Sequence, residues 1–439
     1  MQDAAGIAAG ATAEIGRTTL AKVSFRLLPF VLLLYVVAWF DRVNISAAAL
    51  TMNKDLGFSS AVYGFGAGVF FVGYALCEVP SNLILARIGA RVWIARIMIT
   101  WGVLSVAMMY VHGPWTFYIV RFLLGAAEAG FLPGVLYYLG HWFPAAERAR
   151  AVSWFMLAIP LSSVVGNPLA GLLLELDGWH GLTGWQWLFL LEGVPAVILG
   201  VVVLFYLTDA PEQAKWLLPE QRRWLAERIA AEHHAAHTRH GVGLGKALLH
   251  PTVWLLALVL FAGQTGSYGL QLWIPQMVKS VSGLGNLAST ILSAVPYIAA
   301  SIGMVMIGAS SDRTGERFLH LAIPTGVGAV AFIAIAFVTS PLLSLGLLAI
   351  AAVGNTSTRG PFWALPTRFL TGTAAAGGIA LINTVASLGG LVGPYAVGLL
   401  RTWTGGFGAG LAFLGVLMLI GAGATLMLRK APVLADPRD

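Results

Sequence analysis

The sequence predicts an all-α membrane protein with twelve transmembrane helices in two pseudo-symmetric six-helix halves. Three observations support this fold class. First, 58% of the 439 residues are hydrophobic and only 10% are charged, whereas soluble domains carry about 25% charged residues. Second, twelve apolar runs are close to or longer than the roughly 20 helical residues that cross a bilayer. Third, one loop motif occurs at corresponding positions of the two halves of the chain.

The predicted spans are separated by loops in which Lys and Arg are unevenly distributed. The spans cover residues 27–51, 61–86, 92–110, 115–139, 151–174, 187–207, 252–277, 287–310, 319–338, 342–365, 374–399 and 407–428. An even number of spans places both termini on one side. With the N-terminus inside, 20 of the 26 Lys and Arg residues fall in cytoplasmic segments and 3 in outer segments. Because cytoplasmic loops carry an excess of Lys and Arg, we expect both termini to be cytoplasmic.

A polar segment between the sixth and seventh spans divides the chain. We predict an N-terminal six-helix half at 1–208, a cytoplasmic linker at 209–250 and a C-terminal six-helix half at 251–439. The linker sequence PEQRRWLAERIAAEHHAAH is typical of an amphipathic surface helix. This part of the chain also holds His233, His234, His237 and His240. No cysteine or acid accompanies these histidines at a fixed spacing, so we interpret them as a solvated linker and expect no metal site.

The loops after the second and eighth spans share a motif. The first reads NLILARIGAR and the second GASSDRTGER. At an offset of 226 residues, Arg87, Gly89 and Arg91 match Arg313, Gly315 and Arg317. Pro168 of the fifth span and Pro394 of the eleventh span are separated by the same offset. The repeat indicates duplicated halves related by an axis along the membrane normal, an architecture in which the substrate site lies near the midplane.

Several charged side chains lie inside predicted spans. Asp41 and Arg42 are in the first span, Arg121 and Glu128 in the fourth, and Arg359 in the tenth. A charge at the bilayer centre costs between about 2.5 and 17 kcal/mol, and such residues usually face a bundle interior or a wet cavity. Arg121 and Glu128 are two helical turns apart and therefore share a face. These residues are candidates for a functional site, and the alternative is a static set of ion pairs that locks helices together.

The composition argues against other classes of protein. The net charge of +7 is spread over short loops, which sets membrane topology and does not indicate nucleic-acid binding. The single cysteine, Cys77, permits no intrachain disulfide. The chain shows no phosphate-binding loop, metal-ligand set or nucleophile triad. We therefore expect neither an enzyme nor a cofactor.

The motifs resemble those of the major facilitator superfamily. Its GxxxDRxGxR loop between spans 2 and 3 recurs between spans 8 and 9, and the second copy here is complete, with Gly308, Asp312, Arg313, Gly315 and Arg317. The first copy has Asn82 and Ala86 where Gly and Asp would stand. The resemblance implies that both loops act in gating, through arginines that bind helix carbonyls and acidic partners. The alternative is that they only anchor topology.

Longer stretches resemble the anion:cation symporter branch of that superfamily, and most closely its tartrate-type transporters. They are FDRVNIS, GYALCEVPSNLILARIGAR, RFLLGAAEAGFLPG, GWQWLFLLEGVPA and TRGPFWALPTRF. The resemblance implies that Asp41 and Glu128 act in proton coupling, that Arg42 binds a substrate carboxylate, and that Arg121 is a charge partner of the acids. It also implies that Tyr74 and Asn383 contact the substrate.

Arg359 is followed by Pro361, which can open the helix and leave carbonyls free. We hypothesise that Arg42 and Arg359, one from each half, bind the two carboxylates of a short dianion, because a guanidinium matches a carboxylate in charge and shape. The alternative is that Arg359 caps the freed carbonyls. Trp363 is a further candidate substrate ligand that could supply a ring face.

We therefore expect a secondary active transporter that imports a small organic carboxylate anion by proton symport. Its expected partners are the anion, protons and the lipid bilayer, its expected location is the bacterial inner membrane, and its expected state is a monomer. An antiporter or efflux pump on the same fold is the alternative. The fifth span reads GNPLAG and lacks the fuller glycine run expected of antiporters, which favours the importer.

Overall fold

The computed structural model describes residues 2–144, 147–148, 151–152, 155, 158–237, 249–366, 370 and 372–430. In these ranges the regular elements are helices. The first half of the chain contains α1 Gln2–Asp55, α2 Ser60–Ile88, α3 Ala90–Ala107, η1 Met108–Tyr110, α4 Pro114–Glu128, α5 Phe131–Trp142, α7 Ala158–Leu174, η2 Trp179–Gly181 and α8 Gly184–Tyr206. The segment that follows contains η3 Pro211–Gln213 and α9 Pro219–His237.

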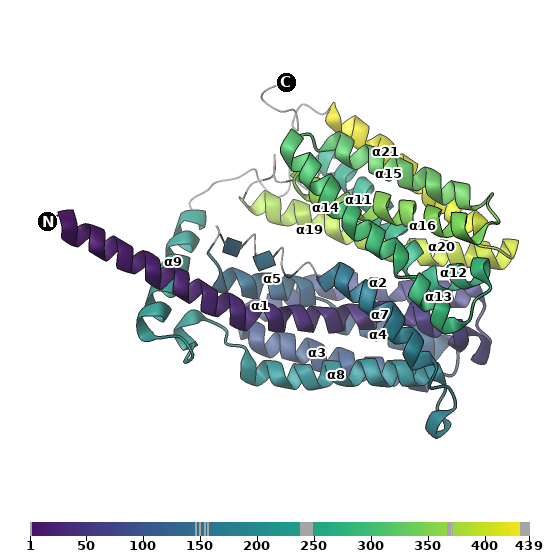
Figure 1. Ribbon diagram of the computed structural model, residues 1–439, viewed down its shortest axis with the longest axis horizontal. Coiled ribbons are helices and arrows are strands. Elements are labelled where there is room, and N and C mark those ends of the chain that lie inside the picture. The colour runs from purple at the N-terminus through teal and green to yellow at the C-terminus, as the bar shows by residue number, and fades with distance from the viewer. Residues whose placement is uncertain are drawn as a thin grey trace.

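The second half of the chain contains α11 Pro251–Gln271, α12 Ile274–Ser282, α13 Asn286–Leu292, α14 Val295–Thr314, α15 Phe318–Ile335, α16 Pro341–Thr356, α17 Arg359–Trp363, α19 Gly372–Ser387, α20 Gly389–Thr404 and α21 Gly408–Arg429. Figure 1 shows α1 to α8 as one layer and α11 to α21 as a second layer above it. Helix α1 begins and α21 ends at the same end of this bundle, which we call the terminus end. The opposite end is called the far end.

Eleven helices in the described ranges are long and apolar enough to cross a membrane. Their bounds lie within a few residues of the predicted spans, with the exceptions of α1 and α11. In the predicted span 151–174, the described apolar helix Ser162–Leu174 is shorter. The all-helical, two-layer architecture agrees with the fold class predicted from composition and repeats, whereas the division at 208 and 250 stays a prediction.

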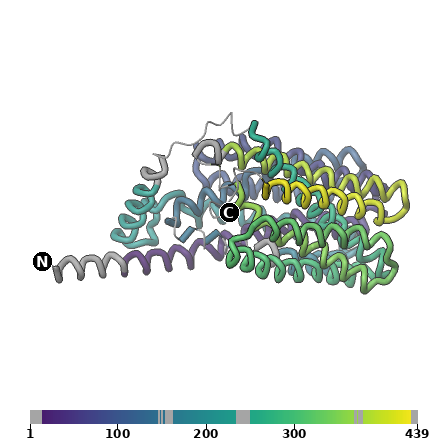
Figure 2. The backbone as a smooth tube through the Cα atoms, turned by 90° about the horizontal axis from the view of Figure 1, so that it is seen from above, coloured from purple at the N-terminus to yellow at the C-terminus, as the bar shows by residue number. Residues whose placement is uncertain are grey.

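Helix α1 is much longer than the predicted span 27–51. It contains 54 residues, or about 80 Å of helix, and its first part extends beyond the bundle (Figure 2). This extension packs against the linker helix α9, where Lys22 donates to Gln221 Oε1 at 3.1 Å. Helix α9 covers the stretch of the linker where a helix was predicted. His240 and the side chains of His233, His234 and His237 lie outside the described residues.

The two layers meet closely at the far end along α2 and α20. A Cβ atom on Gly64 would lie 2.5 Å from the carbonyl oxygen of Pro394, and one on Gly398 would lie 2.3 Å from that of Ser60. Only glycine allows two helices to approach this closely. Next to this seam, Tyr63 donates to the carbonyl of Leu272 across the layers at 2.6 Å. The far end is therefore closed in this structure.

Candidate functional site

A cavity of about 450 Å³ lies between the two layers. Volumes of about 300–1,000 Å³ are usual for small-molecule sites. One wall comes from α1, α2, α5 and α7, and the other from α11, α14, α16, α17 and α19. All five predicted substrate ligands line it: Arg42, Tyr74, Arg359, Trp363 and Asn383. Residues from both halves of the chain thus converge on one space, as the repeat predicted.

Arg42 reaches the cavity from α1 and forms an ion pair with Glu128. The guanidinium also lies over the rings of Trp39 and Tyr74, each 5.4 Å from its carbon. Only 3% of the Glu128 side chain is exposed, so the pair is largely removed from water. A buried carboxylate without its cation is strongly disfavoured. The charge of Glu128 and the availability of Arg42 are therefore linked.

Glu128 stands at a break in the predicted fourth span. Helix α4 ends at Glu128, and α5 begins after Gly130, which adopts a left-handed conformation with φ 87°. The carbonyl that this break frees at Ala129 accepts from Ser81 Oγ at 2.7 Å. The sequence predicted one continuous span at 115–139, and the break was not foreseen. It presents the Glu128 carboxyl at a helix end, where Arg42 reaches it.

Asp41 is buried beside the cavity and does not line it. Its carboxylate accepts from Trp101 Nε1, Ser105 Oγ and Asn44 Nδ2, the last at 3.0 Å. Only 1% of Asp41 is exposed. Because neighbouring positions on a helix point about 100° apart, Arg42 faces the cavity while Asp41 faces α3. The two adjacent charges of α1 thus have different partners.

Arg121 is fully buried between α2 and α4. Its guanidinium donates to the carbonyls of Gly66 at 3.4 Å and Ala67 at 3.2 Å. Helices α2 and α4 approach closely here, since a Cβ on Gly125 would lie 1.9 Å from a carbonyl oxygen of α2. Asp41 and Glu128 are among the charged groups whose field acts on Arg121. The described hydrogen bonds of this arginine go to backbone carbonyls and not to the acids.

Arg359 enters the cavity from the opposite half. It is the first residue of α17, which follows a break after α16. Its Nη2 donates to Gln264 Oε1 at 3.4 Å and to Ser267 Oγ at 3.3 Å. Both partners are neutral side chains of α11. No acidic side chain in the described residues forms an ion pair with this guanidinium.

Asn383 and Trp363 complete the second wall. Asn383 Nδ2 donates to the two carboxylate oxygens of Glu78 at 3.3 and 3.4 Å. Trp363 packs edge-on against Phe362 with ring centroids 5.2 Å apart. Tyr297 also lines the cavity, and its hydroxyl is buried with no hydrogen-bond partner among the described residues.

Sequence reasoning missed Glu78 and Tyr297 as cavity residues. Glu78 precedes Pro80 near the end of a predicted span, and Tyr297 stands alone in an apolar run, so neither was a site candidate. The spacing of Tyr74 and Glu78, four residues apart on one helix, was the available signal for Glu78. A further acid, Glu192, is buried on α8 beside Asn44 and does not line the cavity.

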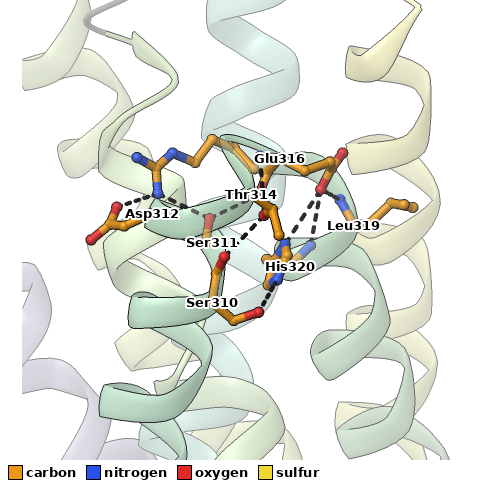
Figure 3. A network of polar contacts seen from close by, with 8 residues as sticks. Ser310, Ser311, Asp312, Thr314, Glu316, Leu319 and His320 are labelled. Carbon is orange, nitrogen blue, oxygen red and sulfur yellow. Dashed lines mark hydrogen bonds and ion pairs between the residues drawn. The ribbon is translucent and has the colours of Figure 1, made fainter.

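The two predicted gating loops lie at the terminus end. In the second loop, Arg317 donates to Ser311 Oγ at 3.0 Å and pairs with Asp312 at 2.5 Å, within the polar network shown in Figure 3. Gly315 ends α14 in a left-handed conformation with φ 70°, and Arg313 is exposed. This ion pair stays inside one loop.

The first loop is connected to the start of the linker. The backbone N–H of Arg91 donates to Asp209 Oδ1 at 2.8 Å, and its Nε lies 3.5 Å from Oδ2. Gly89 has φ 95°, and Asp209 leaves no room there for a Cβ. Arg87 is exposed on the last turn of α2. Asp209 therefore supplies the acidic partner that the first loop itself lacks.

Comparisons with known proteins agree with this architecture. The family profile of the Major Facilitator Superfamily matches residues 31–394. An Agrobacterium vitis protein named as a candidate tartrate transporter is 50% identical over 97% of this chain and 95% of its own length. The quinolone resistance transporter of Acinetobacter baumannii is 45% identical over 93% of this chain and 94% of its own.

A solved structure has the same fold. It is a bacterial homolog of the human lysosomal transporter Spinster in an inward-facing, occupied conformation, with a TM-score of 0.78 and 17% identity, covering 94% of this chain and 98% of that chain. The family profile spans most of the apolar helices described above. The protein is therefore a multi-pass membrane transporter and not an enzyme, and the chain belongs to the major facilitator superfamily.

Proposed function

We propose that this protein is a secondary active transporter that imports a small organic dicarboxylate by proton symport. One observation carries the proposal: Arg42 and Arg359, from opposite halves of the chain, line the same cavity. Two arginines suit the two carboxylates of a short dianion. A four-carbon hydroxy-dicarboxylate such as tartrate is the substrate class that this arrangement favours, and the A. vitis relative's name agrees with it.

Coupling follows from the Arg42–Glu128 ion pair. In the empty carrier, the Glu128 carboxylate holds the Arg42 guanidinium in an ion pair. A proton on Glu128 removes the negative charge, and Arg42 is then free to bind a substrate carboxylate. Burial stabilises the neutral form of a carboxyl group, whereas a neighbouring guanidinium stabilises its charge. Binding of the anion to Arg42 and protonation of Glu128 therefore favour each other.

The neighbouring charges support this exchange. Asp41 acts on Glu128 through its field, and we assign the two acids one shared proton-coupling role. Arg121, fixed by carbonyls of α2, keeps the buried acids from accumulating uncompensated negative charge. Tyr74 and Trp363 supply ring faces and Asn383 an amide to the hydroxyls of the substrate.

The substrate moves through alternating access. In this scheme the halves rock about the cavity, the far-end seam of α2 and α20 opens and closes, and the two loops with Arg91 and Arg317 brace the terminus end. We assign the terminus end to the cytoplasm because of its excess of Lys and Arg. The membrane is the bacterial inner membrane, and the working unit is a monomer of two halves joined by the linker at 209–250.

The test is uptake into proteoliposomes with a panel of mono- and dicarboxylates. We expect a dicarboxylate to accumulate against its gradient only when an inward proton gradient is imposed. We expect Asp41→Asn to keep substrate exchange and to accumulate less substrate than the wild type under the same proton gradient. Uptake that ignores the proton gradient would refute symport while leaving the fold untouched.

An efflux pump is the second candidate. The 45% identity to a quinolone resistance transporter supports it, as do the aromatic cavity residues Trp39, Tyr74 and Trp363. The same proteoliposomes distinguish the two functions. Proton-driven movement of a planar aromatic drug in the direction opposite to the proton flux, with no dicarboxylate uptake, would favour efflux.

A further inference from the structure

Glu78 is a carboxyl group on the wall of an anion site. It lies on α2, four residues after Tyr74, and both side chains line the cavity. Only 9% of Glu78 is exposed. No ion pair in the described residues includes it. An ionised carboxylate in this position repels an anionic substrate and loses much of its hydration.

Glu78 also connects the two halves. Its oxygens accept from Asn383 Nδ2 at 3.3 and 3.4 Å, and Asn383 belongs to α19 of the opposite half. Among the described residues, Glu78 and Asn383 are the one pair of side chains that forms hydrogen bonds between the halves. Asn383 is itself a proposed substrate ligand. It therefore bonds either to Glu78 in the empty carrier or to the substrate in the loaded one.

The charges that face the cavity balance in the empty carrier. Arg42 pairs with Glu128, and the remaining two charges on the wall are those of Arg359 and Glu78. Of the titratable or charged groups around Glu78, Tyr74 is on its own helix and Arg42 comes from α1. A dianion adds two negative charges to this neutral set, and a closed cavity with two uncompensated charges is strongly disfavoured.

We propose that Glu78 is a further proton-coupling residue, which takes up one proton for each anion bound while Asn383 turns from Glu78 to the substrate. With the proton shared by Asp41 and Glu128, two protons then accompany one dianion. The loaded cavity is as neutral as the empty one, and the transport cycle carries no net charge. This inference rests on the proposed symport of a dicarboxylate.

The experiment measures the number of protons that enter with each substrate. Wild-type proteoliposomes are loaded with a pH-sensitive dye and given radiolabelled tartrate at zero membrane potential. We expect about two protons per tartrate for the wild type and about one for Glu78→Gln. Glu78→Asp, which keeps an ionisable group, should return the ratio towards two. A merely structural role of Glu78 would change the rate of uptake and leave this ratio unchanged.

Membrane potential gives an independent readout. With one proton per dianion, Glu78→Gln moves one net negative charge inward, so an inside-negative potential of about 100 mV should lower its accumulation about 50-fold. Accumulation by the wild type should not change with the membrane potential, because its cycle carries no net charge. The control is Thr402→Val, which removes the far-end hydrogen bond between Thr402 Oγ1 and the N–H of Ala61 and should keep the wild-type ratio and electroneutrality.

The outcomes separate this inference from the proposed function. If the wild type shows no proton-coupled tartrate uptake, the proposed function fails. If the wild type is coupled and Glu78→Gln has the same proton ratio and the same indifference to potential, the role of Glu78 is wrong while symport stands. Substrate exchange without a gradient is the folding control, because it needs a working cavity and no net proton movement.

Discussion

Replacing Arg359 by Gln tests the two-arginine clamp. The substitution removes the positive charge on the C-terminal wall and keeps an amide near Gln264 and Ser267, the present partners of Arg359 at 3.4 and 3.3 Å. These partners are neutral, so no buried acid loses its cation. A hydrogen bond that involves charged groups contributes about 1.5–3 kcal/mol, which corresponds to about 10- to 150-fold in affinity.

The assay compares two ligands that differ by one carboxylate, tartrate and its monoamide. Binding is measured by competition against labelled tartrate in exchange-competent proteoliposomes. We expect Arg359→Gln to weaken the binding of tartrate by about 10- to 150-fold. The binding of the monoamide, whose carboxylate contacts Arg42, should weaken by far less. The control is Arg401→Gln, since Arg401 contacts Gln276 at 3.0 Å and does not line the cavity.

An equal loss for both ligands would refute the clamp. That result would favour the alternative stated from the sequence, in which Arg359 only stabilises the break near Pro361.

Three further predictions concern coupling, gating and stability. Asp41→Asn should retain tartrate exchange and accumulate less tartrate than the wild type under the same proton gradient, because the proton shared by Asp41 and Glu128 is lost; unchanged accumulation would show that Asp41 is structural. Gly64→Leu should hold the far end open, because a Cβ there would lie 2.5 Å from a carbonyl of α20; a cysteine placed at Ser60 should then react several-fold faster with an impermeant thiol reagent. Gly89→Ala should destabilise the protein by about 1–2 kcal/mol through its positive φ and lower the melting temperature, whereas Gly308→Ala, with open space around it, should not.

The features predicted well from the sequence were those set by the membrane. The lengths of the apolar runs predicted the transmembrane spans. The loop motif, in which Arg91 corresponds to Arg317, indicated the duplicated halves. Charges inside spans pointed to a site because lipid tolerates them poorly. Arg42, Tyr74, Arg359, Trp363 and Asn383 do meet at one cavity.

The features that could not be predicted depend on contacts between distant helices. The break after Glu128 follows from Gly130 and from Ser81, which lies 48 residues away from Ala129 in the sequence. The charges of α4 predicted that Arg121 belongs to the functional site. The Arg121 guanidinium instead donates to carbonyls of α2, because glycines let the two helices approach closely. Glu78 faces Asn383 across 305 residues. A single sequence holds no signal for such pairs.

The far-end seam between α2 and α20 includes direct contacts between backbone atoms. Gly64 meets the carbonyl of Pro394, and Gly398 meets that of Ser60. These backbone contacts need no change of side-chain rotamer when the two helices separate or rejoin, and their shape does not depend on what fills the cavity. Recognition and closure thus use different atoms, and α2 is the helix that takes part in both. Side chains on the cavity wall can therefore be exchanged for those that suit another substrate while the closing surface stays as it is.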